Sequence, residues 1–369
     1  MNVALLGFGV VGRGVYDLLA PRDDLQVRYV VCRRDVTLPD AKVTKDFREV
    51  LEDETVDTVV EAIGGLHPAF EYVRDAILAG KNIVTSNKAL VATFYDELLP
   101  LVKEKGVSFR CTSAVGGGIG WLSELERARR IQDIHKVGGI MNGTCNYILD
   151  NMTRLGLGYD EALKQAQALG YAEADPSTDV EGTDTWHKAI LSANIAFGIS
   201  LDTSGIPAAG IDKIAACDVE AFTAHGRVCK LLSTGLSNEG KISVFVQPTL
   251  VKQGEPESAV PLNFNLITFE GAASGRMSLY GQGAGRYPTA YNVVQDLVDI
   301  LAGKSFYAPY GGKTTVCNDL EMSYYVRGAQ WPGETVDTWG QGVITAPVSV
   351  SAIHAWRKEN PDAFIAALA

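Results

Sequence analysis

"MNVALLGFGVVGRGVYDLL", residues 1–19, decides the fold of the first part of the chain. A short apolar run ends in glycine and continues into a segment whose apolar residues recur at helical spacing. Between the two lie Gly7, Gly9 and Gly12 in the order G-x-G-x-x-G. In that motif the first glycine permits a tight turn, the second lets a pyrophosphate approach the main chain, and the third lets strand and helix pack closely. We expect a dinucleotide site here, and the alternative is a glycine-rich turn that binds nothing. The residues expected to contact the cofactor are Gly7, Phe8, Gly9, Val10, Val11 and Gly12.

Strands and helices continue to alternate over roughly the first 120 residues. Apolar, β-branched runs predict strands at "VRYVVC" (27–32), "VDTVVEAIG" (56–64), "KNIVTSN" (81–87) and "VSFRCTSA" (107–114), with helical segments between them. Such alternation predicts an α/β fold with a Rossmann-type, doubly wound parallel sheet and helices on both faces.

The pattern changes in the second part of the chain, where strands of alternating character follow several helices. This indicates a second domain of the α+β class with an open mixed sheet. The run "YPTAYNVVQDLVDILAG" (287–303) predicts a helix that returns to the first domain. The expected limits are 1–130 and 286–330 for the dinucleotide-binding domain, 131–285 for the second domain, and 331–369 for a C-terminal tail of unclear role.

Composition narrows the class of partner. The formal net charge of −11 opposes attraction to a phosphate backbone, so nucleic acid is not expected as a partner. Six scattered cysteines lack metal-ligand spacing and indicate free thiols in a reducing compartment. No apolar run is long enough to span a bilayer, and the first residues do not resemble a signal peptide. We expect a cytoplasmic protein without a membrane partner.

The end of the second predicted strand bears on the choice of cofactor. It reads "VCRRD" (31–35), where an NAD-specific site usually carries an acidic residue for the ribose hydroxyls. Arg33 and Arg34 can instead bind a 2′-phosphate. Asp35 could reverse this preference, and a solvated charged loop is the alternative. NADP is therefore favoured over NAD.

Two segments contain candidate catalytic side chains. Lys88 follows a predicted strand at the carboxyl edge of the sheet, where doubly wound folds bind ligands, although it could equally be a surface lysine at the start of a helix. In "GYAEADPSTDVEGTDTWHK" (170–188), Asp184 and Lys188 are four residues apart and share one helix face. The many carboxylates of this segment would repel one another unless they are solvated or bind a cationic group. The alternative is a solvated loop in which Asp179 or Thr183 caps the next helix.

The chain resembles the homoserine dehydrogenase family from residue 1 to about 302. The motifs "GFGVVG", "SNKAL", "AVGGGI", "NGTCNYIL", "EALKQAQALGYAEADPSTDVEGTD" and "GQGAG" occur in the family's order. The resemblance implies NAD(P)-dependent, reversible reduction of L-aspartate 4-semialdehyde to L-homoserine, a small-molecule amino-acid substrate, and a homodimer. It also implies that residues 131–285 form the substrate-binding, catalytic and dimerisation domain. The alternatives are a paralogous dehydrogenase acting on another amino or hydroxy aldehyde, and a non-catalytic NADP-binding sensor.

The resemblance also implies residue roles. Lys188 matches the proton donor to the carbonyl oxygen, and Lys88 matches a second lysine near nicotinamide and substrate. Glu173 and Asp184 match carboxylates that hold the substrate's amino group and position the catalytic groups. A protonated lysine suits the chemistry, because aldehyde reduction needs a proton at oxygen as well as a hydride at carbon. The other expected contacts are Gly143, Thr144, Tyr171 and Asp179 for the substrate, and Ile63, Gly64, Lys88 and Gly283 for the cofactor.

The chain departs from the family in three places. Family members bind a monovalent cation such as sodium through main-chain carbonyls, which here would belong to Thr112, Val115, Gly117 and Ile119. Thr112 stands where the family usually has glutamate, and Gly120 where it usually has proline, and both differences count against that cation. The tail is too short for a complete regulatory domain of the ACT type, so feedback inhibition by threonine through such a domain is not expected.

Overall fold

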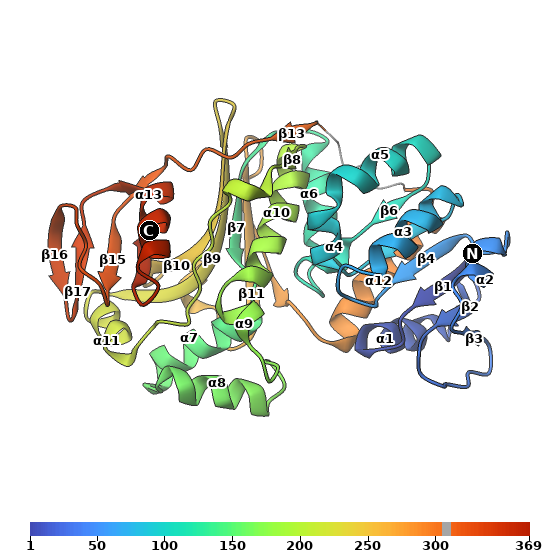
Figure 1. The fold of residues 1–369 in the computed structure, drawn as a ribbon, viewed down its shortest axis with the longest axis horizontal. Helices are drawn as coiled ribbons and strands as arrows, with labels where there is room; N and C mark the ends of the chain where they lie inside the picture. The colour runs from blue at the N-terminus through green and yellow to red at the C-terminus, as the bar shows by residue number, and fades with distance from the viewer. Residues whose placement is uncertain (305–310) are drawn as a thin grey trace. The chain divides into compact units, whose positions relative to one another are not determined.

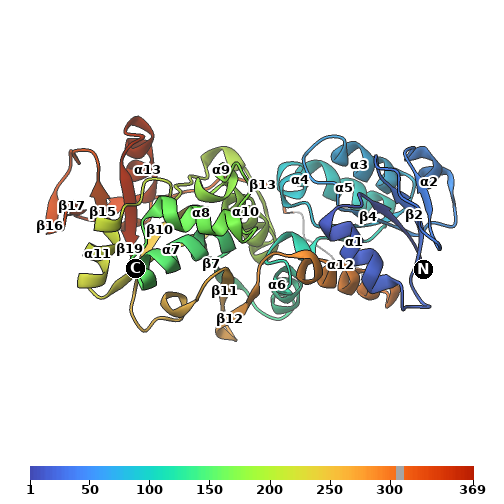
Figure 2. The ribbon, with the colours of Figure 1, turned by 90° about the horizontal axis from the view of Figure 1, so that it is seen from below.

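The computed structural model describes residues 1–304 and 311–369, which form two compact units (Figures 1 and 2). Unit 1 comprises Met1–Ile131, Gly198–Ser200 and Gln282–Lys313, and unit 2 comprises Gln132–Phe197, Leu201–Gly281 and Thr314–Ala369. Residues 305–310, inside the expected range 286–330, lie outside the described residues.

Unit 1 is built on a six-stranded parallel sheet with the order β3-β2-β1-β4-β5-β6. The chain builds outward from β1 in one direction and then returns to continue from β4 in the other. The order therefore reverses between β1 and β4, and ligands of doubly wound folds bind at such a point, beyond the carboxyl ends of the strands. The strands are β1 (Asn2–Leu6), β2 (Gln26–Val31), β3 (Lys42–Thr44), β4 (Thr58–Glu61), β5 (Asn82–Thr85) and β6 (Phe109–Arg110).

Helices cover both faces of this sheet, which confirms the predicted doubly wound α/β class. Figure 2 shows α1 and α12 on one face and α3 and α5 on the other. The apolar side chains of β1 and α1 pack with those of α12 in one core, so the returning helix completes the unit as predicted. The helices of unit 1 are α1 (Val10–Leu19), α2 (Arg48–Glu52), α3 (Ala69–Leu78), α4 (Lys88–Thr93), α5 (Tyr95–Lys105), the 3₁₀ helix η1 (Thr112–Ala114), α6 (Trp121–Arg129) and α12 (Arg286–Leu301).

Unit 2 contains a nine-stranded mixed sheet with the order β12-β11-β7-β9-β10-β19-β15-β17-β16. The long hairpin of β9 and β10 is antiparallel, whereas β10 pairs with β19 in parallel. The sequence analysis did not assign β9, although it lies in the middle of the sheet. The strands are β7 (Ile134–Ile140), β9 (Arg227–Asn238), β10 (Lys241–Lys252), β11 (Phe264–Gly271), β12 (Gly275–Gln282), β15 (Tyr324–Arg327), β16 (Thr335–Trp339), β17 (Gly342–Thr345) and β19 (Phe364–Leu368). Two further pairs are β8 (Ser200–Leu201) with β13 (Lys313–Thr314), and β14 (Glu321–Met322) with β18 (Val348–Ser349).

Helix α10 covers one face of β7, β9 and β10 (Figure 1). At Gly235 on β9 an added Cβ would lie 3.5 Å from Phe197 and 3.6 Å from Ala193, both on α10, which shows how closely helix and strand pack. The helices of unit 2 are α7 (Gly143–Leu155), α8 (Tyr159–Ala168), α9 (Ser177–Val180), α10 (Thr183–Phe197), η2 (Thr203–Gly205), α11 (Ala216–Ala224), η3 (Pro256–Ala259) and α13 (Val350–Glu359).

The C-terminal residues extend the unit 2 sheet. Residues 314–330, assigned above to the first domain, belong to unit 2 together with 331–369. The strands β19-β15-β17-β16 stand in the order 4-1-3-2 by position in the chain, which is the arrangement of a split β-α-β-β-α-β domain. Only α13, between β17 and β19, is present as a helix, while residues 328–334 connect β15 to β16 and place Trp331 against Trp356.

All six cysteines are free thiols, as predicted. In the part of the chain that the structure describes, no helix is both long and apolar enough to cross a bilayer.

Candidate active site

A buried ion pair stands at the start of α10. Lys188 donates from Nζ to Oδ2 of Asp184 at 2.7 Å and to the main-chain oxygen of Met141 at 2.8 Å. The two side chains are only 10% and 8% exposed. The four-residue spacing along the helix brings the pair together, as the sequence predicted. Burial at this level rules out the surface ion pair that the spacing alone allowed.

Asn142 ties this pair to a second carboxylate. Its Nδ2 group donates to Oδ1 of Asp179 at 2.7 Å and to Oδ2 of Asp184 at 2.9 Å. Its own Oδ1 accepts from the main-chain nitrogen of Cys145 at 2.8 Å, which makes Asn142 the N-cap of α7. The sequence analysis did not select Asn142. Its place just before the "GTCNYIL" helix is a capping signal, but that signal does not reveal the bonds to residues 37 and 42 positions away.

Asp179 lies in the short helix α9, and its surroundings shift its pKa. Burial, and then the negative charge of Asp184, raise the pKa of Asp179 above its usual value. The Cys145 thiol donates to the main-chain oxygen of Asp179 at 3.2 Å, and burial raises the pKa of this thiol, which disfavours the reactive thiolate. Two carboxylates, Asp179 and Asp184, therefore accompany one lysine, and the group carries excess negative charge when both are ionised.

The other residues of unit 2 that were expected to contact the substrate differ in their own contacts. The Thr144 hydroxyl donates to the main-chain oxygen of Tyr171 at 2.7 Å, and the Tyr171 ring packs edge-on against Tyr147. An added Cβ at Gly143 would lie 2.6 Å from the Asn263 main-chain oxygen, so this position requires glycine. Glu173 is exposed, and its carboxylate makes no hydrogen bond or ion pair with any side chain in residues 1–304 or 311–369. The structure thus does not bring Glu173 to the lysine.

In unit 1 the glycine turn has the geometry that its motif predicts. Gly7 has φ +97°, and an added Cβ there would lie 2.6 Å from the Ala62 main-chain oxygen. At Gly12 an added Cβ would lie 2.2 Å from the Gly7 oxygen, so helix and turn can approach only without a side chain. Apart from the chain neighbours of Gly9, no described atom lies within 4 Å of a Cβ added there, which leaves room for a ligand beside the main chain. Phe8 packs against Tyr16, and Val10 and Val11 begin α1.

The arginines after β2 are exposed. Neither Arg33 nor Arg34 makes a side-chain hydrogen bond or ion pair with another described residue. Asp35, which the sequence left as a competing ribose ligand, pairs with Lys45 at 2.7 Å, and this contact lowers the pKa of Asp35. The loop therefore offers two guanidinium groups while its carboxylate already has a cationic partner.

The remaining cofactor candidates follow β4 and β5 or precede α12. Ile63 and Gly64 form the turn after β4, and Lys88 is the first residue of α4. Gly283 lies close to Gly117, where an added Cβ would be 2.5 Å from the Gly283 oxygen. These residues lie in unit 1, whereas Lys188 lies in unit 2.

The segment expected to hold a monovalent cation makes hydrogen bonds of its own. The Gly117 oxygen accepts from Asn292 Nδ2 at 2.6 Å, and the Ile119 oxygen accepts from the Trp121 nitrogen at 2.7 Å. Two of the four carbonyls therefore already accept a hydrogen bond, and a cation at this segment stays a prediction. The hydroxyl of Thr112 donates to Oδ1 of Asp296 at 2.7 Å. Among the described residues, no cluster of His, Cys, Asp and Glu side chains could hold a metal ion.

A glycine turn on a doubly wound parallel sheet, together with a mixed-sheet unit that buries a lysine beside two carboxylates, defines a two-unit, dinucleotide-dependent oxidoreductase. The comparisons with known proteins agree. The sequence model described as "Homoserine dehydrogenase, NAD binding domain" matches residues 7–112, and the model described as "Homoserine dehydrogenase" matches residues 121–298. The chain belongs to the homoserine dehydrogenase family, whose members are NAD(P)-dependent oxidoreductases.

Individual relatives cover most of the chain. The homoserine dehydrogenase of Bacillus subtilis is 37% identical over 330 residues, which are 84% of this chain and 76% of the relative. That of Corynebacterium glutamicum is 38% identical over 337 residues, covering 86% and 76% of the two chains. The crystal structure of a homoserine dehydrogenase from Thiobacillus denitrificans superposes with a TM-score of 0.87 at 30% identity, covering 100% of this chain and 98% of that one.

The raised pKa of Asp179 predicts how Asp179→Asn changes stability with pH. Below the pKa of the unfolded chain, Asp179 is protonated in both states and contributes no penalty. As pH rises towards the higher folded pKa, the unfolded state ionises more readily, so the wild type loses stability. We expect the free energy of unfolding of D179N, minus that of the wild type, to increase with pH across this window and then level off. Urea unfolding at a series of pH values measures it.

Asp175→Asn is the matched control. Asp175 lies four residues earlier and is exposed, and hydrogen bonds from Ser177 lower its pKa. The stability difference for D175N should therefore change with pH in the opposite direction. A D179N difference that stays flat or falls as pH rises would contradict the electrostatics inferred here.

Proposed function

We propose that this chain catalyses the reversible, NAD(P)-dependent reduction of L-aspartate 4-semialdehyde to L-homoserine, with Lys188 as the proton donor. The observation that carries the proposal is the buried contact of Lys188 with Asp184 and the Met141 oxygen. An ammonium has three N–H donors, and these two contacts use two of them. The third can meet the carbonyl oxygen of a substrate.

The chemistry of the step follows from this arrangement. When bound, the nicotinamide supplies the hydride for reduction and accepts it in the reverse direction. Negative charge develops on the substrate oxygen as the carbonyl is reduced, and the Lys188 ammonium stabilises that charge and transfers a proton to the oxygen. In the reverse direction the neutral amine accepts the hydroxyl proton of homoserine. Asp184 keeps the lysine oriented through their hydrogen bond.

The charge of the group favours a substrate that carries an ammonium. With Asp184 paired to Lys188, the carboxylate of Asp179 is the remaining negative charge, and Asn142 holds it in place at 2.7 Å. A substrate ammonium beside Asp179 would offset the effects of burial and of the Asp184 charge, which raise the pKa of Asp179. This favours an amino aldehyde over an uncharged hydroxy aldehyde. Exposed Glu173 would contribute only if its segment moved towards the substrate.

We also propose a preference for NADP. Arg33 and Arg34 are exposed and without side-chain partners among the described residues, and Lys45 engages the nearby Asp35. Two guanidinium groups at the end of β2 suit the two negative charges of a 2′-phosphate.

Lys188→Ala tests the reaction and the proton donor together. Purified wild-type protein should reduce NADP or NAD with homoserine, followed by nicotinamide absorbance, and should turn over related amino alcohols less efficiently. The variant should lose kcat by roughly a hundredfold to ten-thousandfold, because the transition state loses its general acid. Binding of NADPH, measured by its fluorescence, should remain near that of the wild type.

Lys230→Met provides the matched control. Lys230 is also buried in unit 2, but it donates to Asn146 and to the Val260 oxygen rather than to a carboxylate. This variant should retain turnover at temperatures where it is folded. Unchanged kcat in K188A would remove the proton-donor role, and turnover of a different amino alcohol but not homoserine would select a paralogous activity.

Arg33→Ala tests the cofactor preference. The variant should raise KM for NADPH by about tenfold or more, because it removes a charge-assisted contact to the 2′-phosphate. KM for NADH, which lacks that phosphate, should change little. Parallel titrations of both cofactors measure the ratio, and equal increases for both would exclude the 2′-phosphate contact.

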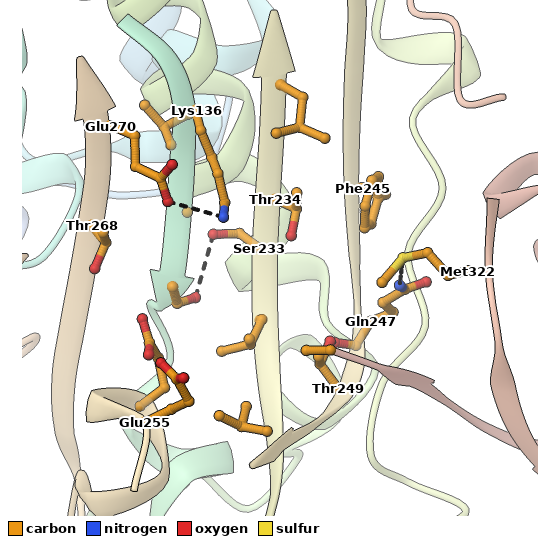
Figure 3. Close-up of a pocket in the computed structure, with 18 of the residues that line it drawn as sticks. Lys136, Ser233, Thr234, Phe245, Gln247, Thr249, Glu255, Thr268, Glu270 and Met322 are labelled. Atoms are coloured by element: carbon orange, nitrogen blue, oxygen red, sulfur yellow. Dashed lines mark hydrogen bonds and ion pairs between the residues drawn. The ribbon is translucent and has the colours of Figure 1, made fainter. Parts of the chain in front are cut away.

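We further propose that the chain forms a homodimer through the sheet face opposite α10. This face of β7, β9 and β10 borders a cavity of about 380 Å³, whose lining includes the charged Lys136 and Glu270 and the apolar Phe245 (Figure 3). Leu236 lines it and is half-buried. Leu236→Arg should shift the mass measured by light scattering from dimer to monomer, whereas Leu78→Arg, on the exposed surface of α3, should not. A monomeric wild type would overturn this assembly.

A further inference from the structure

A buried carboxylate also ends β4 in unit 1. Glu61 is 0% exposed, and a carboxylate taken out of water is costly unless hydrogen bonds or charges replace the lost hydration. Its hydrogen-bond partners in residues 1–304 and 311–369 are all uncharged. Glu61 therefore forms no ion pair with a described residue, and its three hydrogen-bond donors must replace the lost hydration.

The donors come from two segments that follow neighbouring strands. Oε1 of Glu61 accepts from the main-chain nitrogens of Ile63 at 2.8 Å and Gly64 at 3.1 Å. Oε2 accepts from the hydroxyl of Thr85, at the end of β5, at 2.6 Å. The carboxylate thus folds the turn after β4 back onto itself and links it to β5. Gly64 has φ +82°, a conformation that glycine adopts easily and that these bonds hold.

Asn87 closes the network. Its main-chain nitrogen donates to the Thr85 hydroxyl at 3.0 Å, and its Nδ2 donates to the Gly65 oxygen at 2.7 Å. Its Oδ1 accepts from the Leu90 nitrogen at 3.2 Å, so Asn87 caps α4. The turn after β4 and the start of α4 are therefore joined both through Glu61 and Thr85 and through Asn87. The next residue is Lys88.

This network stands where the sheet order reverses. Glu61 ends β4, and β4 pairs with β1, which leads into the glycine turn. That turn touches the one after β4, because an added Cβ on Gly7 would lie 2.6 Å from the Ala62 oxygen. Dinucleotides bind in the crevice beyond the strands at this point of a doubly wound sheet. Two segments that border the crevice thus depend on one buried carboxylate.

We propose that Glu61 is a positioning residue that holds the turn 62–65 and the start of α4, with Lys88, in one arrangement towards the cofactor. The carboxylate touches neither substrate nor cofactor and acts through the main chain of the turn and through Thr85 and Asn87. The link to catalysis rests on the proposed function, whereas the link to cofactor binding does not. A shift of even 1 Å at these segments would misplace the reacting groups, which costs about a hundredfold in comparable cases.

Glu61→Gln is the principal test, because it keeps the shape of the side chain but replaces one acceptor by a donor. That amide must face either the main-chain N–H groups or the Thr85 hydroxyl. We expect the Kd for NADPH to rise about tenfold and kcat with homoserine to fall by roughly ten- to a hundredfold. Thr85→Val, which removes one donor, should have a smaller effect in the same direction, and Thr85→Ser should restore most of the loss. Thr58→Val, at the amino end of the same strand and also fully buried, is the control and should change neither quantity.

A double-mutant cycle separates positioning from general destabilisation. If Glu61 acts through Lys88, the effect of E61Q on kcat should be much smaller in a Lys88→Ala background. Equal effects in both backgrounds, or a fall in Tm with unchanged Kd and kcat, would overturn the proposal. Should E61Q fail to fold, the Thr85→Val and Thr85→Ser pair carries the same test. Absence of homoserine turnover in the wild type would refute the proposed function, while the Kd series would still decide the role of Glu61.

Discussion

The lysine ammonium buried at the start of α10 is the constraint on which the rest of unit 2 depends. A charge removed from water needs a close countercharge and further hydrogen bonds, and removing one partner of such a pair costs about 3–5 kcal/mol. Asp184 supplies the countercharge to Lys188, and the Met141 oxygen supplies a second acceptor at 2.8 Å. These contacts fix where β7 must end and where α7 must begin, since Asn142 both caps α7 and binds Asp184.

The expected sites of the two units are built from different chemical groups. Unit 2 relies on charged and amide side chains, whose identity determines the electrostatics. Unit 1 relies mainly on the main chain: Gly7 and Gly12 allow close approaches, and the turn after β4 is held through its N–H groups. A substitution in unit 2 therefore changes charge, whereas one in the glycine turn changes shape. The carboxylate of Glu61 acts partly in the same way, through the main-chain nitrogens of Ile63 and Gly64, and partly through the Thr85 hydroxyl.

The sequence predicted features that depend on neighbouring residues better than contacts between residues far apart in the chain. Three features depend on residues near one another in the chain: the glycine motif, the alternating strands, and the pair Asp184 and Lys188. Their spacing and periodicity were therefore enough to predict them. The bonds of Asn142 to Asp179 and Asp184 cross 37 and 42 positions. The parallel pairing of β10 with β19 joins Thr249 to Ala367, and no local signal specifies it. The substrate roles of Tyr171 and Glu173 came from family resemblance and stay predictions, because the exposed Glu173 lies outside the hydrogen-bonded group.

The position of β19 has a consequence for how the protein avoids aggregation. This five-residue strand lies between β10 and β15, and it joins the hairpin of β9 and β10 to the C-terminal strands. Ala366 and Ala367 are fully buried within it. If β19 detached, two strand edges would be exposed at once, each with unpaired N–H and C=O groups able to pair with another chain. Fraying of this one short strand would thus be a direct route to aggregation. Substitutions that loosen its packing would be harmful even though they lie far along the chain from Lys188.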